Sequence, residues 1–393
     1  MPSVADSVVI VGAARTPMGG FQGDLKEKTA PELGAIAIRA ALARAGVPSE
    51  AVDEVLMGCV LPAGTGQAPA RQAALGAGLP QSVGAATVNK VCGSGMKTAM
   101  LAHDSILAGT NRIVVAGGME SMTNAPYLLP KARGGFRLGH GEVKDHMFLD
   151  GLEDAYDKGR LMGTFAEDTA QHFQFTRAAQ DDYALESLRR AKAAVQGGFF
   201  RGEIVPVAVK GREIVDDEQP LKADPAKIRT LKPAFRPDGT VTAANASSIS
   251  DGGAALVLMR LSEAEKRGLK PLARIVGHAT HAQAPAWFTT APVGAMQKLF
   301  EKTGWSAASV DLFEINEAFA VVAMATMREL GLPHDKVNVH GGACALGHPI
   351  GCSGARLIVT LLAALEKYGK TRGVASLCIG GGEATALAVE RLN

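Results

Sequence analysis

A cysteine in a glycine-rich turn is the first candidate for chemistry in this sequence. Cys92 lies within the stretch VNKVCGSGMK, between an apolar run at residues 85–88 and a segment whose apolar residues recur at helical spacing. These patterns predict a buried strand followed by a helix that ends near Gly109. Gly93 and Gly95 let a ligand approach the backbone, and a helix N-terminus carries a partial positive charge. We therefore expect an acidified, nucleophilic thiol, although an inert core cysteine fits the local sequence equally well.

Three further loops carry groups that complement a cysteine nucleophile. His348 lies between a glycine and a proline, and an imidazole that titrates near neutrality would be a base for the thiol; the alternative is a structural histidine. Asn316 follows a predicted strand at residues 310–315 and either donates to an oxyanion or caps the next helix. Cys378 closes another predicted strand and precedes three glycines. The N–H group of Gly380 is a candidate oxyanion donor, or these glycines only make a turn around a core thiol.

Alternating strand and helix patterns must position these loops. The first strand is predicted at residues 8–11, and the alternation that follows it predicts a mostly parallel sheet. Residues 119–250 are rich in proline, glycine and charge, except for a long helix predicted at residues 176–196, and we interpret them as an inserted domain. Regular alternation then resumes, with a strand predicted at residues 337–339 before the His348 loop.

The late part of the chain resembles the early part. Like Cys92, Cys352 lies in a short stretch with two glycines and a serine that opens a helix, and the strand after each helix ends in glycines. Such a long period predicts two duplicated halves about a pseudo-two-fold axis, with both sets of glycine turns aimed at one cleft. We divide the chain into a first half, an inserted loop domain and a second half, which comprise residues 1–118 plus 251–270, 119–250 and 271–393.

Composition excludes several classes of protein. The chain has 393 residues, is 47% hydrophobic and 20% charged, and carries a net charge of +2, so we expect neither nucleic acid nor an anionic membrane as a partner. Five cysteines without a C-x-x-C pair favour a reducing compartment over disulfides or a structural zinc site. We see no signal peptide, membrane span or C-terminal targeting tripeptide, and therefore expect a cytoplasmic protein. Basic residues between Lys210 and Lys232 are either a solvated surface or a binding face for a phosphorylated ligand.

Several long motifs, in order along the whole chain, resemble those of one family. The strings VNKVCGSGMK, INEAFA, GGACALGHPIGCSGAR and CIGGGEA look like the four signature blocks of the thiolases, and RTPMG, GGMESM and GTVTAANASS extend the resemblance. The sequence most resembles the acetyl-CoA C-acetyltransferase branch. This resemblance implies an α/β thiolase-like fold, in which two mixed-sheet halves form α/β/α/β/α layers with an inserted loop domain.

The resemblance also implies a ping-pong Claisen condensation of two acetyl-CoA molecules and its reverse, thiolysis. By similarity, Cys92 becomes acylated, His348 activates it and forms an oxyanion hole with a water held by Asn316, and Cys378 removes the α-proton of the second substrate. The N–H groups of Cys92 and Gly380 would form the second oxyanion hole. Coenzyme A thioesters are then substrates, and no cofactor or metal is expected.

In the family the inserted domain binds coenzyme A. The positions that match the pantetheine tunnel or its surroundings are Ser247, Ala246, Phe235, Leu152, Met162, Phe319 and Lys222. Lys222 stands near a position where relatives often have arginine, and Trp287 and Phe288 are bulkier than usual and are expected to reshape the acyl pocket. Resemblance further implies a homo-oligomer, a dimer or a dimer of dimers, with residues 128–143 as an assembly loop.

Three other functions remain as alternatives. A broad-range 3-ketoacyl-CoA thiolase of fatty-acid degradation would share the same motifs. A non-catalytic thiolase-like lipid-binding protein should lack Cys92, His348 or Cys378, and all three are present. A β-ketoacyl synthase would have a second histidine in place of Asn316.

Overall fold

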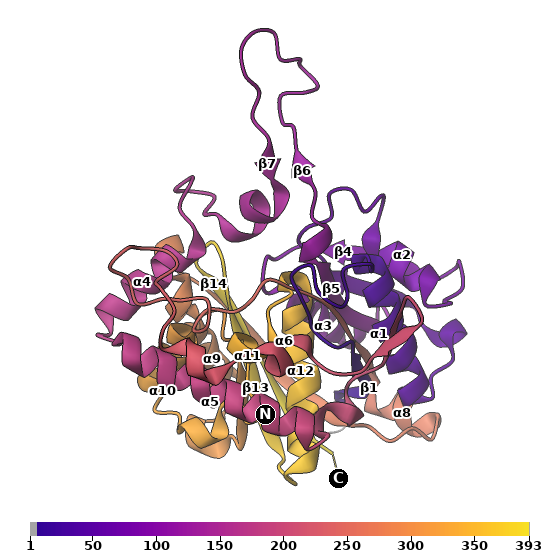
Figure 1. The fold of residues 1–393 in the computed structure, drawn as a ribbon. Coiled ribbons are helices and arrows are strands. Elements are labelled where there is room, and N and C mark those ends of the chain that lie inside the picture. Colours follow the sequence, from indigo (N-terminus) through magenta and orange to yellow (C-terminus); the bar gives the residue numbers. More distant parts are fainter. Residues whose placement is uncertain (1–5, 393) are drawn as a thin grey trace.

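A single mixed sheet dominates the computed structural model, which describes residues 6–392 (Figure 1). Its ten strands run in the order β12-β13-β14-β11-β1-β10-β5-β3-β4, with β2 paired to β10. The strands are β1 (Val8–Arg15), β2 (Gly19–Gly20), β3 (Glu54–Gly58), β4 (Gly84–Val88), β5 (Ile113–Ser121), β10 (Ser250–Arg260), β11 (Ala273–Ala282), β12 (Leu312–Ile315), β13 (Arg372–Ile379) and β14 (Glu383–Arg391).

The sheet has the same organisation on both sides of its centre. There β1 and β11 pair antiparallel, and moving outward on either side gives two antiparallel pairings and then a parallel one. Only β3–β5, β3–β4 and β12–β13 are parallel among the described strands, so the expectation of a mostly parallel sheet is wrong. The reason is that β14 turns back directly after β13, while β10 returns from the insertion in the opposite direction to β5.

Helices form three layers around the two halves of this sheet. The main helices are α1 (Ala30–Ala45), α2 (Pro69–Gly76), α3 (Ser94–Leu107), α8 (Leu261–Lys266), α9 (Ala291–Thr303), α10 (Ala320–Leu330), α11 (Ala343–Leu346) and α12 (Ile350–Lys367). Strand β1 shows the layering by alternation: Val8 and Ile10 share a core with α3 and α12, and Val9 packs against α1. Helices α9 and α10 cover the far face of the second half. The α/β/α/β/α architecture is confirmed.

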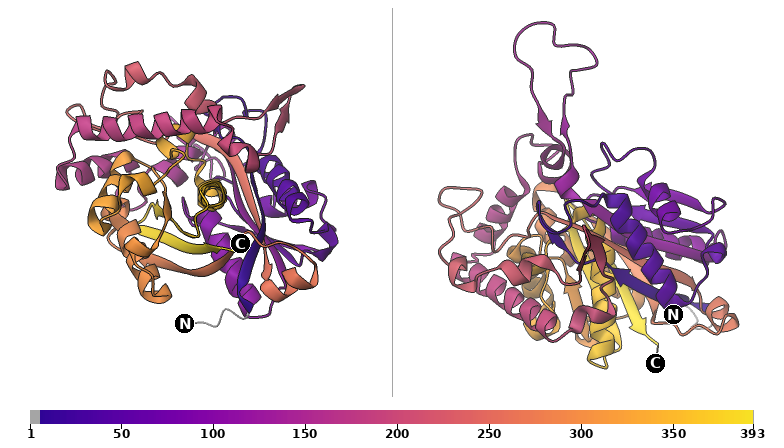
Figure 2. Two further views of the ribbon diagram at one scale, coloured as in Figure 1. Left: turned by 90° about the horizontal axis from the view of Figure 1, so that it is seen from below. Right: turned by 45° about the vertical axis from the view of Figure 1, so that its right-hand side comes forward.

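Helices α3 and α12 cross closely in the middle layer, where Figure 2 (left) shows α12 in gold near the centre of the molecule. A methyl group on Gly354 would lie 2.3 Å from the Met96 nitrogen, and one on Gly95 would lie 2.8 Å from the Ala355 nitrogen. Glycine is therefore required on both helices at this crossing. The turns before both helices carry candidate catalytic residues, so the close crossing brings those turns together.

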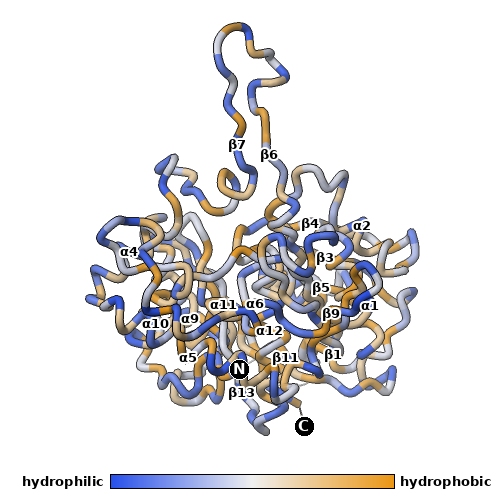
Figure 3. The backbone as a smooth tube through the Cα atoms, in the orientation of Figure 1, coloured by the Kyte–Doolittle hydropathy of each residue, from blue (hydrophilic) through white to orange (hydrophobic). Residues whose placement is uncertain are grey.

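The segment between β5 and β10 forms the insertion. It contains α4 (Met162–His172), α5 (Arg177–Gln196), α6 (Glu218–Lys222), α7 (Pro225–Ile228) and two small hairpins, β6 (Tyr127–Leu128) with β7 (Lys144–Asp145) and β8 (Val207–Val209) with β9 (Arg212–Ile214). Helix α5 begins after the Thr176 N-cap, as predicted. The loop between β6 and β7 projects far from the molecule, whereas hydrophobic residues gather in the central strands (Figures 1 and 3).

Several local predictions are wrong in detail. The strand before Cys92, β4, is largely exposed because it lies at the edge of the sheet and pairs only with β3. Residues 337–339 make a turn with one bridge to Phe313 rather than a strand. The helix after Asn316 begins at Ala320, and Ser262 lies inside α8 rather than at its cap. The predictions that rest on residues 1–5 and on Asn393 lie outside the described part of the chain.

No helix within residues 6–392 is both long enough and apolar enough to cross a membrane.

Candidate active site

Cys92 lies in a tightly bonded turn between β4 and α3. The Ser94 hydroxyl accepts a hydrogen bond from the Lys90 N–H (2.8 Å) and donates one to the Val91 carbonyl (2.7 Å). Val91 has a φ of 46°, a conformation that is strained for a β-branched residue. Because the surrounding bonds impose this turn, the thiol is held in a fixed position just before the first residue of α3.

A cavity of about 370 Å³ opens beside this thiol. Cys92, His348 and Gly380 lie in its wall, and most of the remaining wall is apolar and comes from the insertion and the loop before α10. Six of the seven positions assigned to coenzyme A by resemblance lie there, namely Leu152, Met162, Phe235, Ala246, Ser247 and Phe319. The arrangement is a narrow, largely apolar chamber with one nucleophile and one base at its surface.

His348 is held by a hydrogen-bond chain that fixes its tautomer. Its Nδ1 lies 2.6 Å from the Ser353 hydroxyl, and that hydroxyl donates its single proton to the Pro349 carbonyl (2.9 Å). Nδ1 must therefore carry the imidazole proton, and Nε2 keeps its lone pair. The Asn316 side-chain nitrogen lies 3.3 Å from Nε2, and its side-chain oxygen has no protein partner among the described residues. An unpartnered, buried amide oxygen is able to accept a hydrogen bond from a water or a ligand.

The pKa values of Cys92 and His348 differ from the predictions. Burial raises the pKa of the Cys92 thiol to about 11, and the hydrogen bond from the Gly380 N–H lowers it too little to compensate. The expectation of an acidified thiol is therefore wrong for the free protein. Burial, helped by the nearby Arg356 charge, lowers the pKa of His348 to about 3, so titration near neutrality is also wrong. At neutral pH Cys92 is therefore a neutral thiol and His348 a neutral imidazole in the wall of the same cavity, and a mechanism that uses them moves the thiol proton to Nε2 as the sulfur attacks.

Cys378 lies at the end of β13, fully buried, next to the glycine turn. Burial raises the pKa of its thiol well above the usual value, and a negative charge on Cys92 would raise it further. Cys378 is not in the cavity wall, but it packs with Met162 and Phe319, which are. Cys92 thus lies at the cavity surface, and Cys378 lies in an apolar cluster that borders the same cavity.

The turn after Cys378 needs glycine for a structural reason. Gly381 and Gly382 have φ values of 92° and 88°, which L-residues rarely adopt. A side chain on Gly382 would also meet the Gln283 carbonyl at 2.3 Å. The turn leaves Gly380 facing the cavity, with its N–H directed at the Cys92 sulfur.

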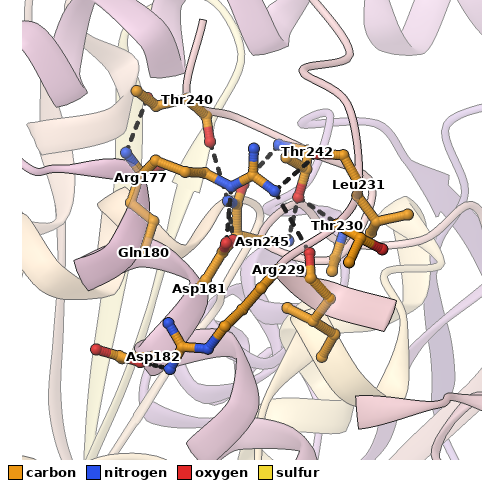
Figure 4. Close-up of polar contacts among 12 residues, drawn as sticks. Arg177, Gln180, Asp181, Asp182, Arg229, Thr230, Leu231, Thr240, Thr242 and Asn245 are labelled. Atoms are coloured by element: carbon orange, nitrogen blue, oxygen red, sulfur yellow. Dashed lines mark hydrogen bonds and ion pairs between the residues drawn. The ribbon is translucent and has the colours of Figure 1, made fainter. Parts of the chain in front are cut away.

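Helix α5 holds one part of the cavity wall in place, the loop that contains Phe235. Arg177 pairs with Asp181 (2.7 Å) and donates to the Leu231 carbonyl (2.8 Å), while Asn245 donates to Asp181 (3.1 Å) and to the Thr240 carbonyl (3.1 Å) (Figure 4). These contacts join the helix to both ends of the loop that contains Phe235. The sequence indicated the helix, but not its bonds to this loop.

Lys222 and Trp287 lie elsewhere. Lys222 forms an ion pair with Glu218 and faces a neighbouring hollow of about 280 Å³, which shares Ala243 and Ser248 with the main cavity. Trp287 lines a different hollow, whereas Phe288 does lie in the cavity wall. Of the two bulky residues, only the phenylalanine is placed to reshape the pocket.

Two buried carboxylates that sequence reasoning did not single out organise the site. Glu120 accepts hydrogen bonds from the backbone N–H groups of Val60, Leu61 and Gly351, and so fixes the start of α12. Glu317, next to Asn316, accepts four bonds, from Tyr183, Ser187, Asn338 and the Cys344 N–H. Both residues lie inside the family-like strings GGMESM and INEAFA, which were the only signal available in the sequence.

The fold and the site together define an α/β enzyme with a cysteine nucleophile at the surface of an internal cavity and a neutral histidine base. Comparison with known proteins gives the family. The family model for the thiolase N-terminal domain matches residues 8–262, and that for the thiolase C-terminal domain matches residues 269–391. The chain belongs to the thiolase family.

Individual relatives cover nearly the whole chain. Acetyl-CoA acetyltransferase 2 of Arabidopsis thaliana is 54% identical, over 98% of this chain and 97% of its own length. Acetyl-CoA acetyltransferase of Escherichia coli (strain K12) is 51% identical, over 98% and 99%. The crystal structure of Acat5 thiolase from Ascaris suum in complex with coenzyme A matches with a TM-score of 0.94 at 42% identity, covering 98% of this chain and 100% of that one.

Proposed function

We propose that this thiolase is an acetyl-CoA C-acetyltransferase, which condenses two acetyl-CoA molecules to acetoacetyl-CoA and coenzyme A and catalyses the reverse thiolysis. The observation that carries the proposal is that the Cys92 thiol and His348, whose Nε2 carries no proton, line the same apolar cavity. The names of the similar proteins from Arabidopsis thaliana and Escherichia coli support this choice of reaction, and the similar Ascaris suum structure supports coenzyme A as the ligand.

The first half-reaction acylates Cys92. The thiol proton passes to His348 Nε2 while the sulfur attacks the thioester carbon, the carbon–sulfur bond to coenzyme A breaks, and the leaving thiolate takes the proton from the imidazolium. The N–H groups of Cys92 and Gly380 serve as donors to one oxyanion, and a water between Asn316 and His348 serves the other. A preorganised donor of this kind lowers the activation barrier by about 3 kcal/mol.

The second half-reaction forms the carbon–carbon bond. Cys378, as the thiolate, takes the α-proton of a second acetyl-CoA, and the resulting enolate carbon attacks the acyl carbon on Cys92. The bond from that carbon to the Cys92 sulfur breaks, and acetoacetyl-CoA leaves. The proton that Cys378 took then passes to the Cys92 thiolate, which restores both sulfurs to the states in which the cycle began. Because burial opposes ionisation of Cys378, this step depends on the oxyanion donors that stabilise the enolate.

The residues of the insertion that line the cavity support its role in binding coenzyme A. We place the pantetheine arm along Leu152, Met162, Phe235, Ala246, Ser247 and Phe319, and the nucleotide end toward the hollow of Lys222. Residues 119–250 then act as a binding unit between two thiolase halves. The reaction on this proposal uses no metal and no further cofactor.

We further propose that copies of the chain associate. The projecting hairpin exposes 92% of Leu138 and 69% of Tyr127, and β4 leaves one edge of the main sheet unpaired within the described chain. Exposed apolar side chains and a free strand edge are typical of interfaces. A dimer or a dimer of dimers would cover both. Five free cysteines support a reducing, cytoplasmic location. The proposed acyl-CoA substrates suggest a role in fatty-acid metabolism there.

Intact-mass spectrometry after exposure to acetyl-CoA tests the assignment of the two cysteines. We expect an acetyl adduct on the wild-type protein and on Cys378→Ser, no adduct on Cys92→Ser, and no condensation by either variant. An adduct on Cys92→Ser would overturn the assignment.

Comparing turnover of acetoacetyl-CoA with that of a ten-carbon 3-ketoacyl-CoA tests the substrate, and a preference for the longer chain would favour a broad-range thiolase instead.

A further inference from the structure

Two histidines and an aspartate meet where the two halves of the molecule join. His103 and Asp104 lie in α3, and His278 lies in β11. The Asp104 Oδ1 atom is 3.1 Å from His103 Nδ1 and 2.9 Å from His278 Nε2, and the three atoms lie within 4.8 Å of one another. None of the three residues lines the active-site cavity, so the cluster is a separate feature.

The spacing of these atoms suits a small divalent metal ion. Zinc binds imidazole nitrogen and carboxylate oxygen at about 2.0–2.2 Å, which places neighbouring ligand atoms of a tetrahedral site about 3.3–3.5 Å apart. The two distances at Asp104 are slightly shorter, so its carboxylate needs to move from each nitrogen by only a few tenths of an ångström, and the two nitrogens already lie within 4.8 Å of each other. Three protein ligands then leave a fourth position for water.

Burial and access also agree with a metal site. The side chains of His103 and His278 are only 11% and 9% exposed, and their rings pack edge to face at 5.0 Å. Asp104 is 53% exposed, which provides a route for an ion from solvent. Two ligands are thus fixed by packing, and the third is free to adjust.

The surrounding charge sets the kind of ion that fits. Asp104 is the only carboxylate of the cluster, and Lys302 lies nearby, donating to the His278 carbonyl (3.2 Å). One carboxylate beside a lysine is a poor site for calcium or magnesium, which require several oxygen ligands. Two imidazoles favour zinc and similar transition metals instead.

We propose that His103, Asp104 and His278 bind one divalent transition-metal ion of the zinc class and so connect α3 of the first half to β11 of the second. The ion would replace the two hydrogen bonds to Asp104 and stabilise the junction between the halves. This site is independent of the proposed acetyltransferase reaction.

Titration of the metal-free, full-length protein with Co²⁺ and Zn²⁺ tests the proposal in a Cys92→Ser background, which removes the thiol at the active-site cavity. We expect one Co²⁺ ion per chain with visible absorption typical of tetrahedral coordination, its displacement by Zn²⁺, and a zinc-dependent rise in melting temperature. Asp104→Asn and His278→Gln should each lower the affinity at least tenfold. The matched control is His140→Gln, because His140 is an exposed histidine outside the cluster, and its binding should stay unchanged.

The outcomes distinguish a metal site from a simple hydrogen-bonded cluster. Binding that is unchanged in Asp104→Asn and His278→Gln, or equally weak in all proteins including the wild type, would overturn the proposal. Circular dichroism shows whether His278→Gln folds. If it does not, the partly exposed Asp104→Asn variant decides the question alone.

Discussion

The hydrogen bonds of Glu317 predict a specific cost for the smallest possible change, Glu317→Gln. Its Oε1 accepts from Tyr183 (2.9 Å) and from Asn338 (2.8 Å), and its Oε2 accepts from Ser187 (2.8 Å) and from the Cys344 N–H (3.0 Å). Each oxygen is therefore shared by one hydroxyl and one N–H donor. A hydroxyl is able to rotate and become an acceptor, but an N–H group is not.

The glutamine amide must place an NH₂ group at one of these two positions. At Oε2 it would face the Cys344 N–H. At Oε1 it would face the Asn338 amide, which is fixed by bonds to both the N–H and the carbonyl of Ile315. One buried donor is left unpaired in either orientation, at about 1–3 kcal/mol, and the remaining bonds weaken from charged to neutral, at about 1 kcal/mol more. We expect a loss of about 2–4 kcal/mol in the free energy of unfolding.

Chemical denaturation of wild type, Glu317→Gln and the exposed control Glu213→Gln measures this loss. The free energy of unfolding of the control should change by less than about 0.5 kcal/mol. Because Glu317 adjoins Asn316 and also holds the loop that leads to His348, we expect slower acylation by acetyl-CoA in single-turnover experiments even where the variant is fully folded. A Glu317→Gln protein as stable as the control would refute the reasoning.

Two further predictions concern buried ionisable side chains. Arg15 is fully buried between Asp217 and Glu203, and Arg15→Gln should lower the free energy of unfolding by about 3–5 kcal/mol because both carboxylates lose their counter-charge. The exposed control Arg229→Gln should lower it by less than about 1 kcal/mol, and equal losses in chemical denaturation would contradict this. Since the folded-state pKa of His348 is lowered from 6.5 to about 3, the native state binds fewer protons than the unfolded state between these values, and stability should fall with decreasing pH by up to about 1.4 kcal/mol per unit. His348→Asn lacks this contribution, so urea denaturation from pH 7.5 to pH 4 should show a shallower decline for the variant, and parallel curves would argue against a buried neutral imidazole.

Local sequence was sufficient for much of the fold. The Thr176 N-cap and the helical periodicity after it predicted α5, and Thr29 with its capping box and Gly46 set the ends of α1. These signals act between residues a few positions apart, so the printed sequence contains them completely. The exposure of β4 is different, because whether a strand lies at an edge depends on which strands come to pair with it.

The candidate site shows the same division. The residue types in the glycine-rich turns, together with the family-like strings, were enough to select Cys92, His348 and Cys378. Their proton affinities were not predictable, because local sequence indicates a helix N-terminus and a rigid turn but not the atoms that exclude water from them. Only the packed structure decided that burial outweighs the Gly380 N–H bond at Cys92 and that the imidazole of His348 stays neutral. Desolvation depends on every segment that closes around a group, and those segments come from distant parts of the chain.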